Sequence, residues 1–65
     1  DRYPNPVTDM LLFANPLSEQ AEIIDLSGRI VVTVMSNERS ADLSSLDSGV
    51  YFFRQSNKTV RLVKQ

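Results

Sequence analysis

The strongest hydrophobic run of the chain is Val-Tyr-Phe-Phe at residues 50–53. An unbroken run of strand-favouring residues places apolar side chains on both faces, which is typical of a central strand with material on each side. Residues 46–49, just before it, have the composition of a tight turn, in which Gly49 supplies a positive φ or lets another backbone approach closely. The pattern therefore predicts a core strand over residues 49–55, preceded by a turn.

Residues 29–34 alternate in a way that also predicts a strand. One face consists of Ile30, Val32 and Val34, and the other of Arg29, Val31 and Thr33. A polar connection over residues 35–40 follows this strand.

The last segment, residues 59–65, has the same alternation. Val60 and Leu62 are expected to face inward, and Thr59, Arg61 and Val63 outward. With a turn at residues 56–58, this segment is expected to pair with the aromatic strand as an antiparallel hairpin. Lys64 is interpreted as an edge-blunting residue.

Residues 9–14 are the first strand candidate. We place Leu11 and Phe13 on the core face, and Met10 and Leu12 on the opposite face. If nothing covers that opposite face, it forms an exposed apolar strip and a candidate docking surface.

Residues 19–26 are ambiguous between a helix and a strand. Asn15 or Ser18 could cap a helix, and the residues that follow tolerate helical structure. The segment is short, however, and it ends at a Ser-Gly pair, so we favour a strand with Ala21 and Ile23 facing inward.

A hairpin turn is expected at residues 25–29, with Gly28 supplying the positive φ. The D-x-S-G string could suggest a catalytic carboxylate at Asp25. An aspartate that stabilises the turn is the preferred interpretation.

Two remaining segments complete the expected fold. The start of the chain, 1–7, is extended because Pro4 and Pro6 fix its backbone and cannot donate ladder hydrogen bonds. A brief strand is expected at residues 41–43, with Leu43 and Leu46 covering the end of the core. About six strands at short spacing, with no convincing helix, predict an all-β protein built as a small antiparallel β-sandwich, with residues 1–65 as one domain.

Composition excludes several classes of function. The 65 residues include no cysteine and no histidine, so zinc sites and Ser-His or Cys-His catalytic pairs are absent. Seven Lys and Arg against eight Asp and Glu give a net charge of −1, which argues against a nucleic-acid partner. With two glycines there is no phosphate-binding glycine-rich loop. We therefore expect no enzyme activity, catalytic residue, metal or other cofactor.

Four stretches together resemble a known family. They are Tyr-Pro-Asn-Pro at residues 3–6, Asp-Leu-Ser-Gly-Arg-Ile-Val at 25–31, Leu-Ser-Ser-Leu-Asp-Ser-Gly-Val-Tyr at 43–51 and Val-Arg-Leu-Val-Lys-Gln at 60–65. In this order and at these intervals they are similar to the C-terminal sorting domain, type A, of type IX secretion cargo. The resemblance covers essentially the whole chain.

The resemblance implies an immunoglobulin-like sandwich of about six or seven strands at the C-terminus of a longer exported protein. It implies that an N-terminal cargo enters the periplasm by its own signal peptide, and that the outer-membrane type IX translocon and its shuttle protein then recognise the folded domain. A surface sortase usually removes the domain, and the cargo is released or joined to anionic lipopolysaccharide. The destination is the cell surface or the extracellular space.

The resemblance also implies which residues form the signal. They are Tyr3, Pro4, Asn5, Pro6, Asp25, Gly28, Arg29, Leu46, Gly49, Val50, Tyr51, Val63, Lys64 and Gln65. Recognition without a pocket suits strand addition, so the final segment, 59–65, is our candidate docking element. Gly28 and Gly49 are interpreted as residues that support the fold.

Two alternatives stay open. A structural or carbohydrate-binding β-sandwich module of a surface protein would use exposed aromatic side chains, for which Tyr3 and Tyr51 are the candidates. The oligomeric state is also open, because edge strands of a small sandwich can pair or exchange between chains, giving an edge-paired or domain-swapped homodimer.

Overall fold

The computed structural model describes residues 9–65, which form six strands and no helix. The strands are β1 (Met10–Leu12), β2 (Ala21–Ile24), β3 (Ile30–Val34), β4 (Ser40–Asp42), β5 (Gly49–Gln55) and β6 (Lys58–Lys64). With no helix in this part of the chain, there is also no helical segment that could cross a membrane. The predicted all-β class is confirmed. The Tyr-Pro-Asn-Pro stretch of Tyr3, Pro4, Asn5 and Pro6 lies outside the described residues.

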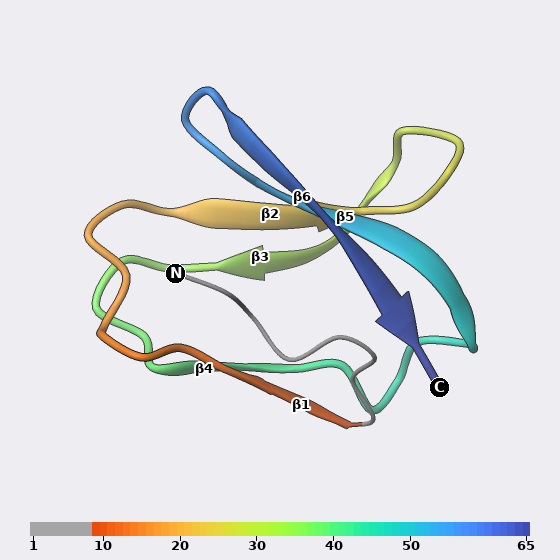
Figure 1. Ribbon diagram of the computed structural model, residues 1–65, viewed down its shortest axis with the longest axis horizontal. Helices are drawn as coiled ribbons and strands as arrows, with labels where there is room; N and C mark the ends of the chain where they lie inside the picture. The colour runs from red at the N-terminus through yellow and green to blue at the C-terminus, as the bar shows by residue number, and fades with distance from the viewer. Residues whose placement is uncertain (1–8) are drawn as a thin grey trace.

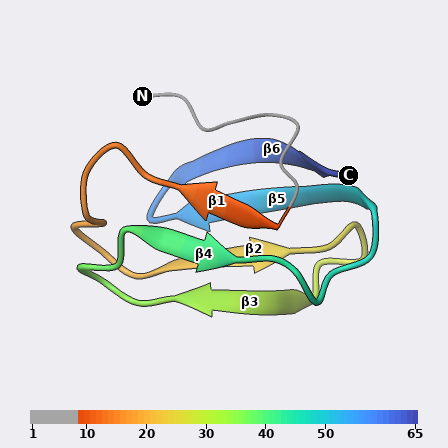
Figure 2. The same ribbon diagram turned by 90° about the horizontal axis from the view of Figure 1, so that it is seen from below.

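The strands form two antiparallel sheets that face each other (Figures 1 and 2). One has four strands in the order β3-β2-β5-β6, and the other consists of β1 and β4. β5 is paired on both sides. It pairs with β2 over residues 52–54 and with β6 along its whole length. The predicted hairpin of the aromatic strand with the last strand is therefore confirmed, as is the antiparallel sandwich arrangement.

The core lies between the two sheets. Its fully buried large side chains are Phe53, Leu11, Ile23, Leu43 and Leu62. The ring of Phe13, which follows β1, packs against the ring of Phe53 with a centroid distance of 5.7 Å and a tilt of 51°. Tilted pairs at this separation are a favourable geometry for aromatic rings. The two sheets are thus joined through their aromatic side chains.

The predicted faces of β1 and β2 are confirmed. Leu11 is fully buried and Phe13 is nearly so, whereas Met10 and Leu12 are 46% and 60% exposed. Residues 21–24 form a strand, with Ala21 and Ile23 buried, so the helical alternative for this segment is wrong. Alternation with period two, rather than the helix-tolerant composition, decided this element.

The predicted alternation of residues 29–34 is wrong at its first half. Ile23 pairs with Val32 while Ile24 pairs with Ile30, so Val31 is an extra residue with no partner in β2. This irregularity is a β-bulge, which reverses the faces of the residues before it. Ile30 is consequently 47% exposed, and Val31 packs against the core instead of facing outward.

A two-residue turn closes the β5–β6 hairpin, because Gln55 pairs with Lys58. Its first central residue, Ser56, has a φ of +55°. A positive φ at the first central position is the pattern of a type II′ turn, which favours glycine there. The serine therefore holds a left-handed backbone at some cost in stability.

We predict that Ser56→Gly stabilises the protein by about 0.5 kcal/mol, because glycine relieves the left-handed strain but loses more backbone entropy on folding. In a domain of this size, that gain raises Tm by roughly 2–4 °C. Thermal unfolding followed by circular dichroism measures the shift. The matched change Asn57→Gly, at a residue whose φ is not positive, should lower Tm. An Asn57→Gly variant more stable than Ser56→Gly would contradict the assignment of the turn.

Candidate functional site

Three predicted signal stretches that are distant in sequence meet at one end of the sandwich. The β2–β3 turn and the start of β5 line an open hollow of about 290 Å³, formed by Asp25, Leu26, Ser27, Ser48, Gly49, Val50 and Tyr51. The end of β6 lies beside the same part of β5, because Val63 pairs with Val50 and Lys64 with Gly49. We call the surface formed by residues 25–29, 46–51 and 63–65 the motif end.

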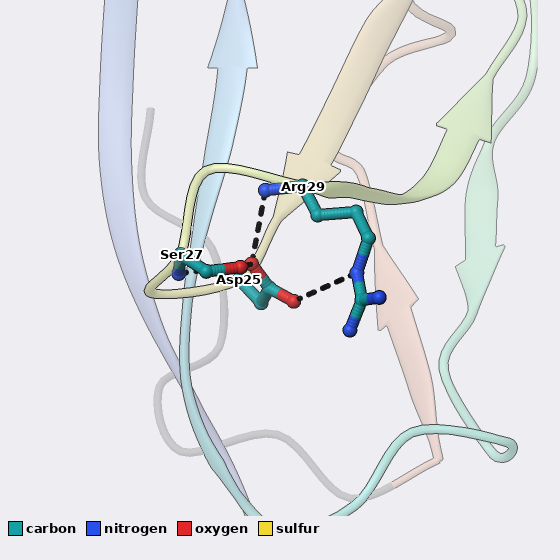
Figure 3. A network of polar contacts seen from close by, with 3 residues as sticks. All are labelled: Asp25, Ser27 and Arg29. Atoms are coloured by element: carbon teal, nitrogen blue, oxygen red, sulfur yellow. Dashed lines mark hydrogen bonds and ion pairs between the residues drawn. The ribbon is translucent and has the colours of Figure 1, made fainter.

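The β2–β3 turn is organised around the carboxylate of Asp25 (Figure 3). Its Oδ1 accepts hydrogen bonds from the backbone N–H of Ser27 and of Arg29, both at 3.0 Å, and from the Ser27 hydroxyl at 2.7 Å. Its Oδ2 lies 3.5 Å from Nε of Arg29. The backbone closes the same turn, because Gly28 N–H donates to the Asp25 carbonyl at 3.0 Å.

These contacts also set the electrostatics of Asp25. The hydrogen bond from the Ser27 hydroxyl, followed by that from the Arg29 backbone, lowers the pKa of the Asp25 carboxyl. A carboxylate with its acceptors occupied in this way holds the turn and is poorly placed to abstract a proton. The predicted turn-stabilising role of Asp25 is confirmed.

Glycine is required at both positions by the backbone conformation rather than by lack of space for a side chain. Gly28 has a φ of +90° and Gly49 a φ of +154°, and a Cβ built on either residue would meet no atom within 4 Å. The positive φ predicted at Gly28 is confirmed. Of the two reasons considered for Gly49, a positive φ applies and close approach of another backbone does not.

The start of β5 is tied to the connection that precedes it. The Tyr51 hydroxyl donates to the backbone carbonyl of Asp47 at 2.7 Å, and the Leu46 N–H donates to the Leu43 carbonyl at 3.0 Å. Tyr51 and Leu46 are partly buried and pack against the core, while Leu43 belongs to it. The expectation that Leu43 and Leu46 cover the end of the core is therefore confirmed.

The expected role of Lys64 as an exposed edge-blunting residue is wrong. Its side chain is only 6% exposed, because alternation along β6 places it on the inner face with Val60 and Leu62. Its Nζ donates to the Gln65 carbonyl at 3.3 Å and lies 4.0 Å from Oδ1 of Asp9. Lys64 therefore acts from within the fold, where its ammonium group holds the end of β6 near the start of β1.

One exposed apolar residue of the motif end was not among the predicted signal residues. Leu26 lies in the centre of the β2–β3 turn, lines the hollow and is 73% exposed. An apolar residue inside an otherwise polar turn was the available signal. Exposed apolar side chains with polar neighbours are typical of the centre of a binding surface.

All of the predicted signal residues that the structure describes lie at the motif end. Asp25, Gly28, Arg29, Leu46, Gly49, Val50, Tyr51, Val63, Lys64 and Gln65 all belong to the motif end. Of the residues the structure describes, no three His, Cys, Asp or Glu side chains come together in a way that could hold a metal ion. The motif end is built from turns and strand ends.

A family model described as "Secretion system C-terminal sorting domain" matches residues 1–65, the entire chain. The chain matches no curated protein and no solved structure. The family is one of sorting signals rather than of enzymes.

We predict that the Asp25 and Asp42 carboxylates make the protein less stable in acid. Each has a pKa lowered by hydrogen bonds, so its contribution to stability is present above the unfolded value and is lost as the pH falls through the folded value. The double variant Asp25→Asn, Asp42→Asn should melt below the wild type at pH 7, and the gap in Tm should narrow as the pH falls below the unfolded value of about 3.9. Circular dichroism melts between pH 7 and pH 2.5 test this. A gap in Tm that stays constant over that range would contradict it.

Proposed function

This chain belongs to the family of secretion system C-terminal sorting domains, and from that premise we propose how it acts. A type IX sorting domain marks the protein that carries it for export to the cell surface or the extracellular space. We propose that an N-terminal cargo crosses the periplasm, where the translocon and its shuttle protein recognise the folded domain. A surface sortase then removes it, and the cargo is released or joined to anionic lipopolysaccharide. The domain is the substrate of that peptidase.

We further propose that the machinery reads the motif end. The observation that supports this is the convergence of three separated signal stretches on one surface, around the hollow of about 290 Å³. Asp25 and the two glycines shape the backbone there, and Leu26 presents an exposed apolar side chain from the middle of the turn. A surface with one apolar residue and a polar surround has the core-and-rim arrangement of a protein interface.

Two other candidate contacts follow from the sequence. Met10 and Leu12 form the exposed face of β1, on the two-stranded sheet. The last strand, β6, lies at one side of the four-stranded sheet and contributes its end to the motif end. Because the Lys64 side chain faces the core, contacts from this strand come from its outward residues and from Gln65.

We predict that Leu26→Asp blocks export while the matched change Leu12→Asp does not. Both leucines are exposed, at 73% and 60%, so neither change should unfold the domain. The measurement uses a fluorescent reporter with a periplasmic signal peptide and residues 1–65 at its C-terminus. Reporter is quantified outside a type IX-competent bacterium, with a machinery-deficient strain as control.

The outcomes separate the candidate surfaces. Normal export of Leu26→Asp with loss for Leu12→Asp would move the contact to the exposed face of β1. Retention of the unaltered reporter in both strains, with the domain folded and accessible, would overturn the sorting function itself. The fate of the domain on exported reporter shows whether it is cleaved.

We also predict that removing residues 63–65 abolishes export and leaves the cargo folded in the periplasm. The truncation takes away two ladder pairs with β5, so the melting of the truncated domain is measured alongside export. Deleting Gln65 alone keeps both pairs and is the matched control. Export that survives the three-residue truncation would exclude the end of β6 as a contact.

The carbohydrate-binding alternative gains no specific support. It would use exposed aromatic side chains, but Tyr51 packs against the core and its hydroxyl is occupied by the Asp47 carbonyl. The other tyrosine, Tyr3, lies outside the described residues.

A further inference from the structure

A groove of about 260 Å³ is lined by residues of β3, of β4 and of the loop between them. Its apolar lining includes Val32, Val34, Met35 and Ala41, and its polar lining includes the carboxylates of Glu38 and Asp42. The Met35 side chain is 55% exposed. The groove shares no lining residue with the hollow of the motif end, so it is a separate feature of the surface.

The two strands that border the groove are both edge strands. Within residues 9–65, β3 is paired only with β2, and β4 only with β1. No backbone hydrogen bond joins β3 to β4 across the groove in this part of the chain. An edge strand presents unpaired N–H and C=O groups, which an added strand can satisfy. The groove therefore has two backbone edges on which an extended peptide could pair.

The sequence of β3 makes its edge well suited to accept a strand. All of its residues are β-branched and none is charged or a proline, whereas edges protected against pairing usually carry such residues. The bulge at Val31 interrupts the regular edge, so pairing is confined to residues 32–34 and the start of the following loop. At roughly 3.3 Å per residue, this length admits about four residues of an added strand.

The charge of the groove indicates what such a strand should carry. Glu38 and Asp42 line it, and none of its lining residues is Lys or Arg. Asp42 Oδ1 accepts a hydrogen bond from the Ser44 backbone N–H at 3.0 Å, which lowers the pKa of Asp42 below its ordinary value. Neither carboxylate forms an ion pair within residues 9–65, and two carboxylates beside an apolar lining favour a partner with cationic and aliphatic side chains.

We propose that the groove between β3 and β4 binds an extended peptide segment of a partner protein, in which aliphatic residues alternate with Lys or Arg. The peptide backbone pairs with β3 at residues 32–34. Its aliphatic side chains contact the exposed Met35 and the partly exposed Val32, and its cationic side chains approach Glu38 and Asp42. This binding property goes beyond the export signal at the motif end.

The test uses the 65-residue chain and a fluorescein-labelled Lys-Val-Lys-Val-Lys-Val peptide, with binding followed by fluorescence anisotropy. A peptide with Glu in place of each Lys is the charge control. We expect the lysine peptide to bind and the glutamate peptide not to bind. The affinity should fall as salt is raised, because the charges are near the surface.

Two sets of variants locate the site. Met35→Lys should abolish binding, because it places a cation in the groove, while the matched change Met10→Lys on the exposed face of β1 should leave binding unchanged. The double variant Glu38→Gln, Asp42→Asn should weaken binding about fivefold, as expected for the loss of two exposed ion pairs. It keeps the side-chain acceptor for the Ser44 N–H.

Equal binding of the two peptides, or full binding by Met35→Lys, would overturn the proposal. The other possible occupant of the groove is a second copy of the chain. Analytical ultracentrifugation of the peptide-free protein shows whether such a dimer forms. A dimer that Met35→Lys dissociates, in a protein that binds neither peptide, would assign the groove to self-association and would also overturn it. All of these measurements use purified protein, so their result does not depend on the outcome of the export experiments.

Discussion

The packing of Phe53 against Phe13 is the contact on which the rest of this fold depends. Phe53 is fully buried, and its strand β5 pairs with Ile23 of β2 on one side and Val60 of β6 on the other. Without disulfides, a domain this small obtains only about 3–5 kcal/mol from its core, and truncating one buried Phe to Ala costs a similar amount. Loss of the Phe53 side chain, of which the contact with Phe13 is one part, would therefore remove most of the stability of the sandwich.

The motif end is a consequence of that sandwich. The β2–β3 turn forms locally, because Asp25 satisfies the backbone N–H groups of Ser27 and Arg29. The position of this turn beside the start of β5 depends on the pairing of β2 with β5. The end of β6 arrives at the same place through seven ladder pairs with β5. A receptor that reads this surface reads a folded state, since none of its parts is close to another in the sequence.

Sequence-based prediction of the local structure at the motif end was accurate where short-range contacts determine it, and inaccurate where strand pairing determines it. The Asx-type turn at Asp25 and the positive φ at Gly28 follow from short-range hydrogen bonding and steric limits. The inward position of Lys64 and the bulge at Val31 do not. Both depend on the register with a neighbouring strand, and a shift of one residue exchanges the two faces of a strand. Leu26 was overlooked because its exposure depends on how far the β2–β3 turn extends from the rest of the fold.

By itself the sequence determined the all-β class, the approximate location of the strands, the turn chemistry and the family. These properties are recorded in alternation of period two, in glycine and aspartate at fixed offsets, and in four motifs in order. Only the tertiary structure decided which strands are edges, which side chains a bulge turns outward, and which distant segments share a surface. Alternation along one strand specifies that it has two faces, but the partner strands determine which face meets the core and which remains available for binding.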